Sequence, residues 1–323
     1  MIGRRGIGAA ALAVPAMARA QGTPPGGWPD RPVTIVVPSA PGGSLDTLTR
    51  LLAEGLREPL GQTVVVENRA GAGGAIGADF VAKSPPDANR FLAGAVHHAI
   101  LPAVQRVSYD SERDLVPVTD MASSPNALIV PAASPARSVA DLVAGLKGGT
   151  LARDYATAGS GTLHHLTGAL FGEAIGVELT PVHYRGSAPA MTDLVAGRVP
   201  YFFETLPSAA QQIRGGAVRA LAVTSAARAP SLPDVPTMAE SGFPTIQVET
   251  WYGLLGPRGT PDAVAARLRD AVARALSTPA LRAAWEQNGV SGGGKPVAAF
   301  AATWRSELAA WGARARAARL SVD

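Results

Sequence analysis

Three turns rich in small residues carry the pattern from which chemistry can be inferred in this sequence. They occupy residues 39–46, 159–162 and 185–189, and each connects a predicted strand to a predicted helix. The first N–H groups of a helix have no partner inside it, and the helix dipole places about half a positive charge there. Such a turn can bind an anion without lysine or arginine. Two or three of them around one cleft would suit a carboxylate, although each is also compatible with a tight connection that binds nothing.

Two acidic residues lie where their charge would affect the binding of an anion. Asp46 falls in the first turn of a predicted helix, and it is compatible with an anion there if its side chain folds back to cap Gly43 or Ser44. Otherwise its charge would repel the ligand. Glu204 ends a predicted strand, where it could hold a water molecule, a hydroxyl group or a ligand proton. The alternative for Glu204 is a strand end that faces solvent.

The histidines do not form a metal-binding pattern. The sequence has five histidines and no cysteine. Two pairs of them, 97–98 and 164–165, are adjacent, and neighbours on a helix point about 100° apart. No His-Glu-x-x-His spacing occurs. We therefore predict no metal site. Because His97 and His98 follow a predicted strand end, one of them could donate a hydrogen bond to a ligand.

Motifs for nucleotides and for a nucleophile are incomplete. Residues 289–295 have the spacing of a phosphate loop, but Pro296 replaces the Ser or Thr that would bind magnesium. The glycine turn at 71–77 lacks the third glycine of a dinucleotide turn. Ser160 lies at a strand-to-helix turn without the flanking glycines of a nucleophile elbow. These observations predict no cofactor and no catalysis.

Residues 1–20 have the pattern of a secretory signal peptide. Arg4 and Arg5 precede an apolar run at 6–17, and small residues surround a cleavage site at 18–20. Export would follow either the Sec or the twin-arginine route. Without this segment, which holds three arginines and no acid, the net charge falls from +4 to +1. No basic cluster remains in the mature chain, so we predict no nucleic-acid partner.

The remaining chain alternates strands with helices, which is typical of parallel α/β sheets. Strands are predicted at 33–37, 63–67, 91–95, 116–121, 127–130, 154–157, 180–184, 201–204, 219–225 and 249–255, and helices at 44–58, 75–83, 139–146, 163–175, 188–196, 262–276, 279–287 and 297–318. Two crossings, near 122–128 and 246–252, predict a two-lobed α/β protein. Ligands bind beyond the carboxyl ends of parallel strands, so the cleft between the lobes is the expected site.

The sequence resembles the Bug (TctC-like) family of periplasmic solute receptors of tripartite tricarboxylate transporters. The resemblance covers essentially the whole chain after the signal peptide. It rests on Asp46 and on the stretches 28–32 (WPDRP), 35–38 (IVVP), 40–43 (APGG), 60–62 (LGQ), 64–69 (VVVENR), 71–74 (GAGG), 184–190 (YRGSAPA), 220–225 (ALAVTS), 232–237 (LPDVPT) and 251–255 (WYGLL).

The resemblance implies a periplasmic binding protein of the type II-like, Venus-flytrap class, with each lobe a mostly parallel sheet flanked by helices. Lobe 1 would comprise residues 28–124 and 250–323, and lobe 2 residues 125–249. The family closes on small organic acids, often dicarboxylates, and holds them largely with main-chain groups and waters. It works with integral membrane transporter subunits, and we expect a monomer.

Carried over by position, the resemblance implies two clamps on the ligand. Lobe 1 would contribute Ser39, Ala40, Gly42 and Gly43, with His98 near the cleft wall. Lobe 2 would contribute three positions, namely Ala158, Gly161 and Thr162.

The sequence departs from the family pattern at two informative places. Glu204 and Thr205 replace the usual Asp-Asn pair, which pushes the carboxylate further into the cleft. Ser39 stands where Phe is common, which removes an aromatic wall. These departures leave the identity of the acid open. The expected function is capture of an organic acid for a transporter, and the alternative is a sensor that presents its liganded form to a membrane signalling protein.

Overall fold

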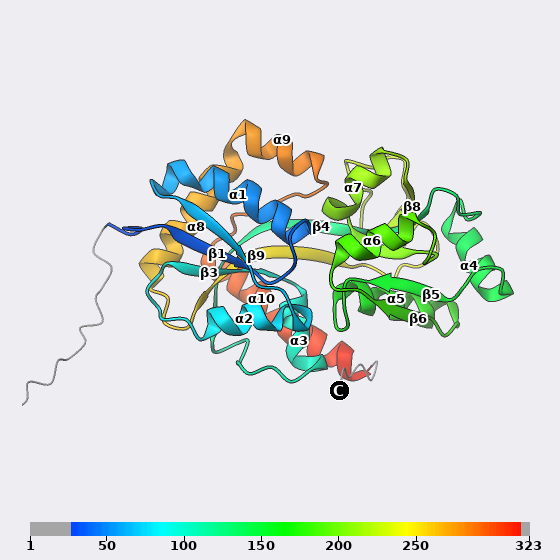
Figure 1. The fold of residues 1–323 in the computed structure, drawn as a ribbon, viewed down its shortest axis with the longest axis horizontal. Coiled ribbons are helices and arrows are strands. Elements are labelled where there is room, and N and C mark those ends of the chain that lie inside the picture. The colour runs from blue at the N-terminus through cyan, green and yellow to red at the C-terminus, as the bar shows by residue number, and fades with distance from the viewer. Residues whose placement is uncertain (1–26, 318–323) are drawn as a thin grey trace, which may run out of the picture.

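The computed structural model describes residues 27–317, which form an elongated molecule with two halves (Figure 1). The strands are β1 (Val33–Val37), β2 (Val64–Asn68), β3 (Arg90–Ala95), β4 (Leu115–Pro131), β5 (Asp154–Thr157), β6 (Thr180–His183), β7 (Phe202–Thr205), β8 (Val218–Val223) and β9 (Glu249–Pro257). The helices are α1 (Ser44–Leu60), α2 (Ala75–Ala82), α3 (His97–Val104), α4 (Val139–Gly148), α5 (Leu163–Ile175), α6 (Ser187–Val195), α7 (Leu206–Arg214), α8 (Asp262–Ser277), α9 (Pro279–Gln287) and α10 (Val297–Ala317). The predicted signal peptide lies outside the described residues.

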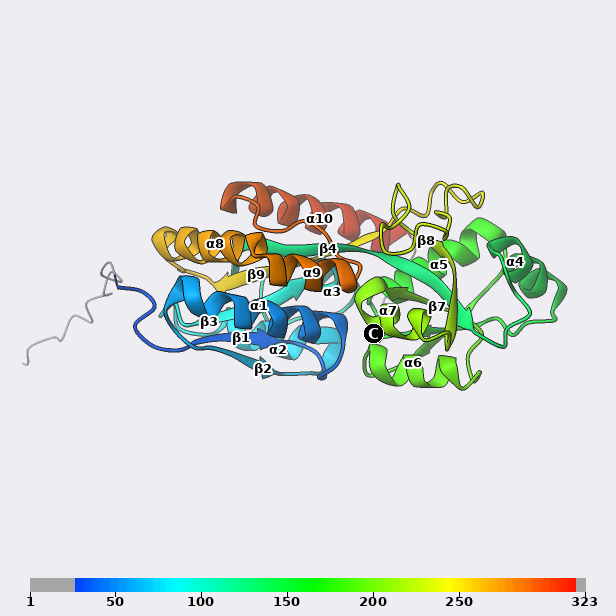
Figure 2. The same ribbon diagram turned by 90° about the horizontal axis from the view of Figure 1, so that it is seen from above.

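We name the two halves by their elements. Half I holds β1–β3, α1–α3 and α8–α10, and half II holds β5–β8 and α4–α7. Strands β4 and β9 run between them (Figure 2). The strand order is β2-β1-β3-β9-β4-β7-β5-β6, with β8 paired to β4. This mixed sheet with flanking helices confirms the predicted α/β class.

The direction of β4 sets the direction of the strands that pair around it. In half I, β1 pairs in parallel with β2 and β3, while β9 is antiparallel to both β3 and β4. Strands β1–β3 therefore run in the direction of β4, from half I towards half II. In half II, β5–β7 are parallel to one another, and β7 is antiparallel to β4. The carboxyl ends of β1–β3 and β5–β7 consequently face each other.

The prediction of two separate strands at 116–121 and 127–130 is wrong, because both belong to β4. Its first part pairs with β9 as far as Pro125, and from Asn126 onwards it pairs with β7 and β8. Pro125 has no N–H to donate, so it is tolerated where the pairing changes partners. The crossing predicted near 122–128 lies at this change of partners within β4.

Two helices were missed from the sequence, α3 and α7. Each is short, and each contains a proline, Pro102 in α3 and Pro207 in the first turn of α7. Proline fits the first turn of a helix, where the backbone N–H needs no internal partner. Segments of eight or nine residues are too short to be stable helices in isolation, so their helical state depends on packing.

Alternation of side chains along the strands builds two apolar layers in each half. In β1, Ile35 packs with α1, α8 and α9, whereas Val36 packs with α2, α3 and α10. In β4, Leu128 and Ile129 likewise point to opposite faces, towards α4 and α5 or towards α6 and α7. Helices therefore cover both faces of the sheet, as a largely parallel sheet requires.

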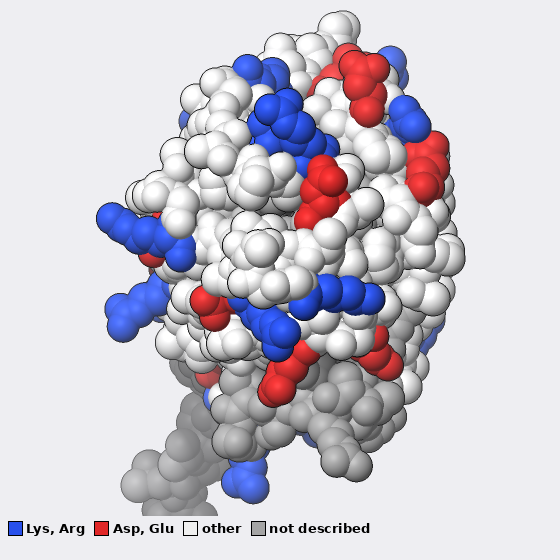
Figure 3. Space-filling view, turned by 90° about the vertical axis from the view of Figure 1, so that its right-hand side faces the viewer, with Lys and Arg blue, Asp and Glu red and all other residues white. Residues whose placement is uncertain are grey.

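The length and apolarity of the helices can be compared with what a membrane span requires, and Figure 3 shows the charges at one end of the surface. None of the helices between residues 27 and 317 is both long and apolar enough to cross a bilayer. Figure 3 shows one end of the molecule, where Lys and Arg side chains are interspersed with Asp and Glu outside the grey region.

Close packing between β3, β9 and α10 gives a stability prediction. Gly253 pairs with Gly94 across the β3–β9 ladder. A Cβ at Gly253 would collide with the Phe300 ring and lie 3.0 Å from the Thr119 carbonyl oxygen. Gly253→Ala should therefore lower the free energy of unfolding by about 1–3 kcal/mol, measured in urea.

The matched control is Gly148→Ala at the end of α4, where a Cβ meets nothing within 4 Å. This variant should be neutral or more stable by up to about 1 kcal/mol. Equal effects of the two substitutions would contradict the packing argument.

Candidate functional site

A cavity of about 610 Å³ lies between the two halves. The three turns singled out in the sequence all contribute to its walls, together with the glycine turn at 70–74. The lining residues are 38–41, 43–45, 70–74, 95–97, 158–159, 162–164, 184–189, Thr205, Thr250 and Tyr252. Each wall turn follows the carboxyl end of a parallel strand, which is where ligands bind in such sheets.

Six helices begin at this cavity. The N-cap residues of α1, α2, α3, α5, α6 and α7 all belong to its lining, and none of them makes a side-chain capping hydrogen bond. By contrast, α4 and α9 start away from the cavity and have Ser138 and Thr278 as capping side chains. Helix α8 also starts away from the cavity, but it has no capping side chain. Uncapped helix starts leave backbone N–H groups available to a ligand.

The charged groups of the lining favour an anion. Among the described residues that line the cavity, Arg185 is the one with a formal charge, and none is acidic. Arg185 is exposed at the rim, and no ion pair within residues 27–317 involves it. The positive ends of six helix dipoles and one arginine therefore act in the same sense.

Half of the residues predicted for the site line the cavity. They are Ser39, Ala40, Gly43, Ala158 and Thr162. Of these, the Ser39 hydroxyl is buried without a hydrogen-bond partner among the described residues. A buried polar group without a partner is costly, so this hydroxyl is suited to a polar ligand atom.

Asp46 and Gly42 do not line the cavity, and the contact between them holds the first turn in shape. The Gly42 N–H donates to the Asp46 carboxylate at 3.0 Å, so the side chain does fold back, although it caps Gly42 instead of Gly43 or Ser44. The same carboxylate receives hydrogen bonds from Arg50 and from the Asn68 amide. Burial alone would raise the pKa of Asp46, but the bonds from Arg50, Gly42 and Asn68 outweigh it, and the pKa is lowered.

The two adjacent histidines divide between the wall and the core. His97 lines the cavity, whereas His98 is fully buried with its Nδ1 accepting from the Ala95 N–H at 3.1 Å. Burial lowers the pKa of His98 to about 4. Burial and the nearby His98 and His164 lower the pKa of His97. Both rings are consequently neutral at pH 7, and a ligand at the wall would meet His97.

Glu204 and Gly161 also lie one layer behind the lining. Glu204 is fully buried, and its Oε1 accepts hydrogen bonds from the Thr205 N–H and hydroxyl at 2.7 and 2.9 Å. His164 Nε2 lies 3.2 Å from the same oxygen but is not aligned for a hydrogen bond with it. The Gly161 N–H donates to the His165 ring at 3.2 Å. Glu204 is therefore not a strand end facing solvent.

Sequence reasoning missed several lining residues. The turn at 70–74 carried a usable signal, because it is a glycine turn between a strand and a helix, like the other three. Tyr252 and Thr250 gave no such signal, since β9 brings them from a distant part of the chain. Groups of three or more potential metal ligands are absent from the described residues.

Comparisons with known proteins agree on one family. The family model described as the tripartite tricarboxylate transporter family receptor matches residues 48–302. A UPF0065 protein encoded in the tcbD-tcbE intergenic region of Pseudomonas sp. (strain P51) is 42% identical over 289 residues, which are 88% of this chain and 85% of that protein.

Solved structures give the same result. The periplasmic binding protein BugD superposes with a TM-score of 0.85 at 34% identity, covering 91% of this chain and 99% of its own. R. palustris Rpa4515, solved with adipate, has a TM-score of 0.86 at 36% identity, covering 90% and 98%. The family is one of receptors and BugD is a binding protein, which confirms the prediction of a solute-binding protein that is not an enzyme.

The contacts of Asp46 predict a pH-dependent contribution to stability. Asp46→Asn should lower the free energy of unfolding by about 1–3 kcal/mol at pH 7, because the charge-assisted bond to Arg50 is lost. The native pKa is depressed, so this contribution is present above the unfolded-state pKa of about 4 and is lost as the pH falls through the lower native value.

Urea unfolding at pH 7, 4 and 3 would measure this difference between the wild-type chain and the variant. Asp87→Asn is the control, because its ion pair with Arg31 is exposed, and it should change stability by less than about 0.5 kcal/mol. A difference for Asp46→Asn that stays constant down to pH 3 would contradict the assigned role.

Proposed function

This chain belongs to the tripartite tricarboxylate transporter family of receptors, and from that premise we propose that it captures a small organic acid in the cavity between its halves. The observation that carries the proposal is the set of six uncapped helix starts that line this cavity. They supply backbone donors and positive potential for a carboxylate. The adipate held by Rpa4515 is an acid of this kind.

Main-chain donors account for recognition without a dedicated cation. At the start of α1 the Ser44 N–H already donates to Ser208, and a carboxylate would meet the N–H groups of the following residues, which no capping side chain occupies. The Asp46 charge there is already neutralised by Arg50. The Ser39 hydroxyl and the His97 ring add polar groups to the same wall. Arg185 at the rim attracts the anion before it is enclosed.

Closure around the ligand follows from the connections between the halves. Among the described residues, 28–124 with 250–317 form one lobe and 125–249 the other, and the lobes hinge about β4 and β9. Such hinge closure of two lobes on a solute is a recognised class of motion. The liganded, monomeric receptor is then delivered in the periplasm to integral membrane transporter subunits.

Ligand binding tests the proposal directly. Calorimetry and thermal unfolding of residues 21–323 with mono-, di- and tricarboxylates, beginning with adipate, should identify at least one acid that binds. An acid at 100 times its dissociation constant should add about 2.7 kcal/mol of stability. If no carboxylate in the panel bound or shifted the melting temperature, the receptor assignment for organic acids would fail.

A bulky substitution locates the site. Ala40→Trp fills the cavity at the first turn and should weaken binding of the identified acid by at least about tenfold, because it blocks the start of α1. Ala133→Trp lies on an exposed turn outside the cavity and is the matched control. Equal affinities for the two variants would place the ligand elsewhere.

Removal of the rim charge gives a salt-dependent effect. Arg185→Gln should weaken binding of the acid by about two- to fivefold at low ionic strength, and the loss should shrink as salt is added. Arg267→Gln on α8, an exposed arginine outside the cavity, should leave the affinity unchanged. An Arg185→Gln effect that is absent or independent of salt would argue against electrostatic capture at the rim.

A further inference from the structure

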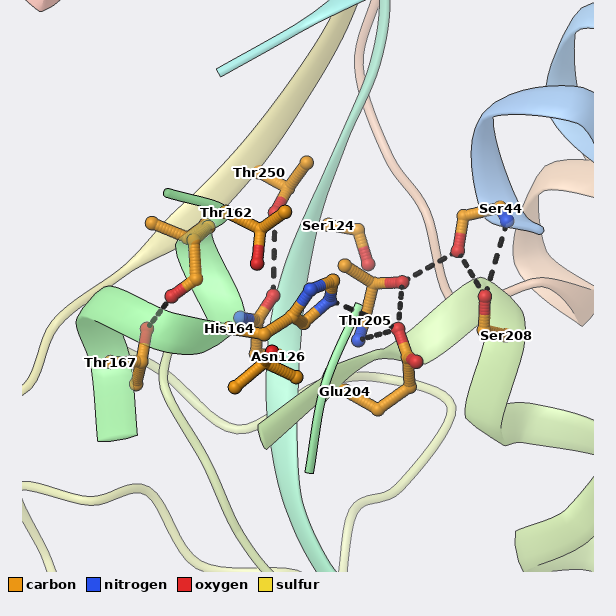
Figure 4. A network of polar contacts seen from close by, with 12 residues as sticks. Ser44, Ser124, Asn126, Thr162, His164, Thr167, Glu204, Thr205, Ser208 and Thr250 are labelled. Carbon is orange, nitrogen blue, oxygen red and sulfur yellow. Dashed lines mark hydrogen bonds and ion pairs between the residues drawn. The ribbon is translucent and has the colours of Figure 1, made fainter. Parts of the chain in front are cut away.

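A short series of hydroxyl groups joins the two halves beside the cavity (Figure 4). Ser44 begins α1 in half I, while Thr205 and Ser208 belong to the start of α7 in half II. The Ser44 hydroxyl oxygen lies 2.5 Å from that of Thr205 and 2.6 Å from that of Ser208. The Ser44 N–H donates to the Ser208 hydroxyl oxygen at 3.1 Å.

The direction of each hydrogen bond in this series can be assigned. Glu204 Oε1 accepts from the Thr205 N–H, so it carries no proton of its own and must also accept from the Thr205 hydroxyl. A hydroxyl has one proton to donate. Thr205 has used its proton on Glu204, so Ser44 donates to Thr205, and Ser208 in turn donates to Ser44. Every donor therefore points along one path that ends on the buried carboxylate.

The position of the carboxylate explains why two helix starts can meet here. Helices α1 and α7 both begin at these hydroxyls, so the positive ends of their dipoles approach each other. Glu204 precedes the N-cap Thr205 directly and is fully buried. Its Oε1 supplies the acceptor at which the donors of the two helix starts converge.

We propose that Glu204 is a positioning residue that holds the two halves closed through the path Thr205–Ser44–Ser208. Ser44 and Thr205 line the cavity, so the hydrogen bond between them holds the two halves together next to a bound solute. Glu204 itself acts through Thr205 and does not touch the ligand. The effect on ligand capture rests on the proposed receptor function, whereas the closed arrangement itself does not.

The chain contains no cysteine, so spin labels attach only at the cysteines introduced for this test. Spin labels on Val65→Cys in β2 and Val195→Cys in α6 report the separation of the halves, and both positions are exposed and lie outside the cavity. Thr205→Val removes the hydroxyl while keeping the side-chain shape, and Thr205→Ser keeps the hydroxyl. Pulsed electron paramagnetic resonance of the ligand-free protein then gives the populations of closed and open molecules.

Thr205→Val should lower the closed-to-open ratio by about fivefold, which corresponds to the loss of one hydrogen bond. Thr205→Ser should match the parent chain, and Glu204→Gln should fall between them because an amide oxygen still accepts while the charge is gone. An unchanged distance distribution in Thr205→Val, or equal behaviour of Thr205→Val and Thr205→Ser, would overturn the proposal. If Thr205→Val did not fold, Ser208→Ala would test the same path from its other end.

Ligand kinetics separate positioning from simple loss of structure. With adipate, or with whichever acid of the panel binds, Thr205→Val should raise the dissociation rate by about fivefold and leave the association rate unchanged, because the closed state is what loses stability. A changed association rate with an unchanged dissociation rate would contradict the proposed path. Failure of every acid to bind would refute the receptor function, while the label distances would still decide the role of Glu204.

Discussion

The direction of a single strand, β4, is the constraint on which the arrangement of this protein depends. Because β4 passes through both halves, the strands parallel to it in half I and antiparallel to it in half II present their carboxyl ends to one another. Each of those ends leads through a short turn into a helix. Six helix starts are thereby brought around one cavity, and the positive potential there arises from backbone geometry more than from charged side chains.

A site that attracts anions in this way must control any acidic side chain close to it. Asp46 and Glu204 are both nearly or fully buried, and both turn away from the cavity towards internal donors. Asp46 shapes the first turn and is paired with Arg50. Glu204 receives the hydrogen bonds of Thr205 between two helix starts. The two acids therefore stabilise the turns behind the cavity wall, and neither of them lines the cavity.

Much of the fold was accessible from the sequence because local patterns specify local structure. The apolar run of β1 and the glycine that ends α1 are readable without tertiary information. The continuity of β4 could not be read from the sequence. Pro125 ends the pairing with β9, and only the neighbouring strands show that β4 continues in a second pairing, with β8. Helix α7 was missed for a similar reason, because its nine residues become helical through packing.

The sequence alone indicated the class of site: strand, glycine turn and helix start recur along the chain, and the first N–H groups of each such helix have no partner inside the helix. The tertiary structure decided which turns meet, and it added the turn at 70–74 and Tyr252 to the wall. It also turned the Glu204 side chain towards Thr205. Whether a carboxylate faces a ligand or a neighbouring hydroxyl depends on contacts such as Ser44 with Thr205, which join residues 161 positions apart, and no local pattern encodes such a contact.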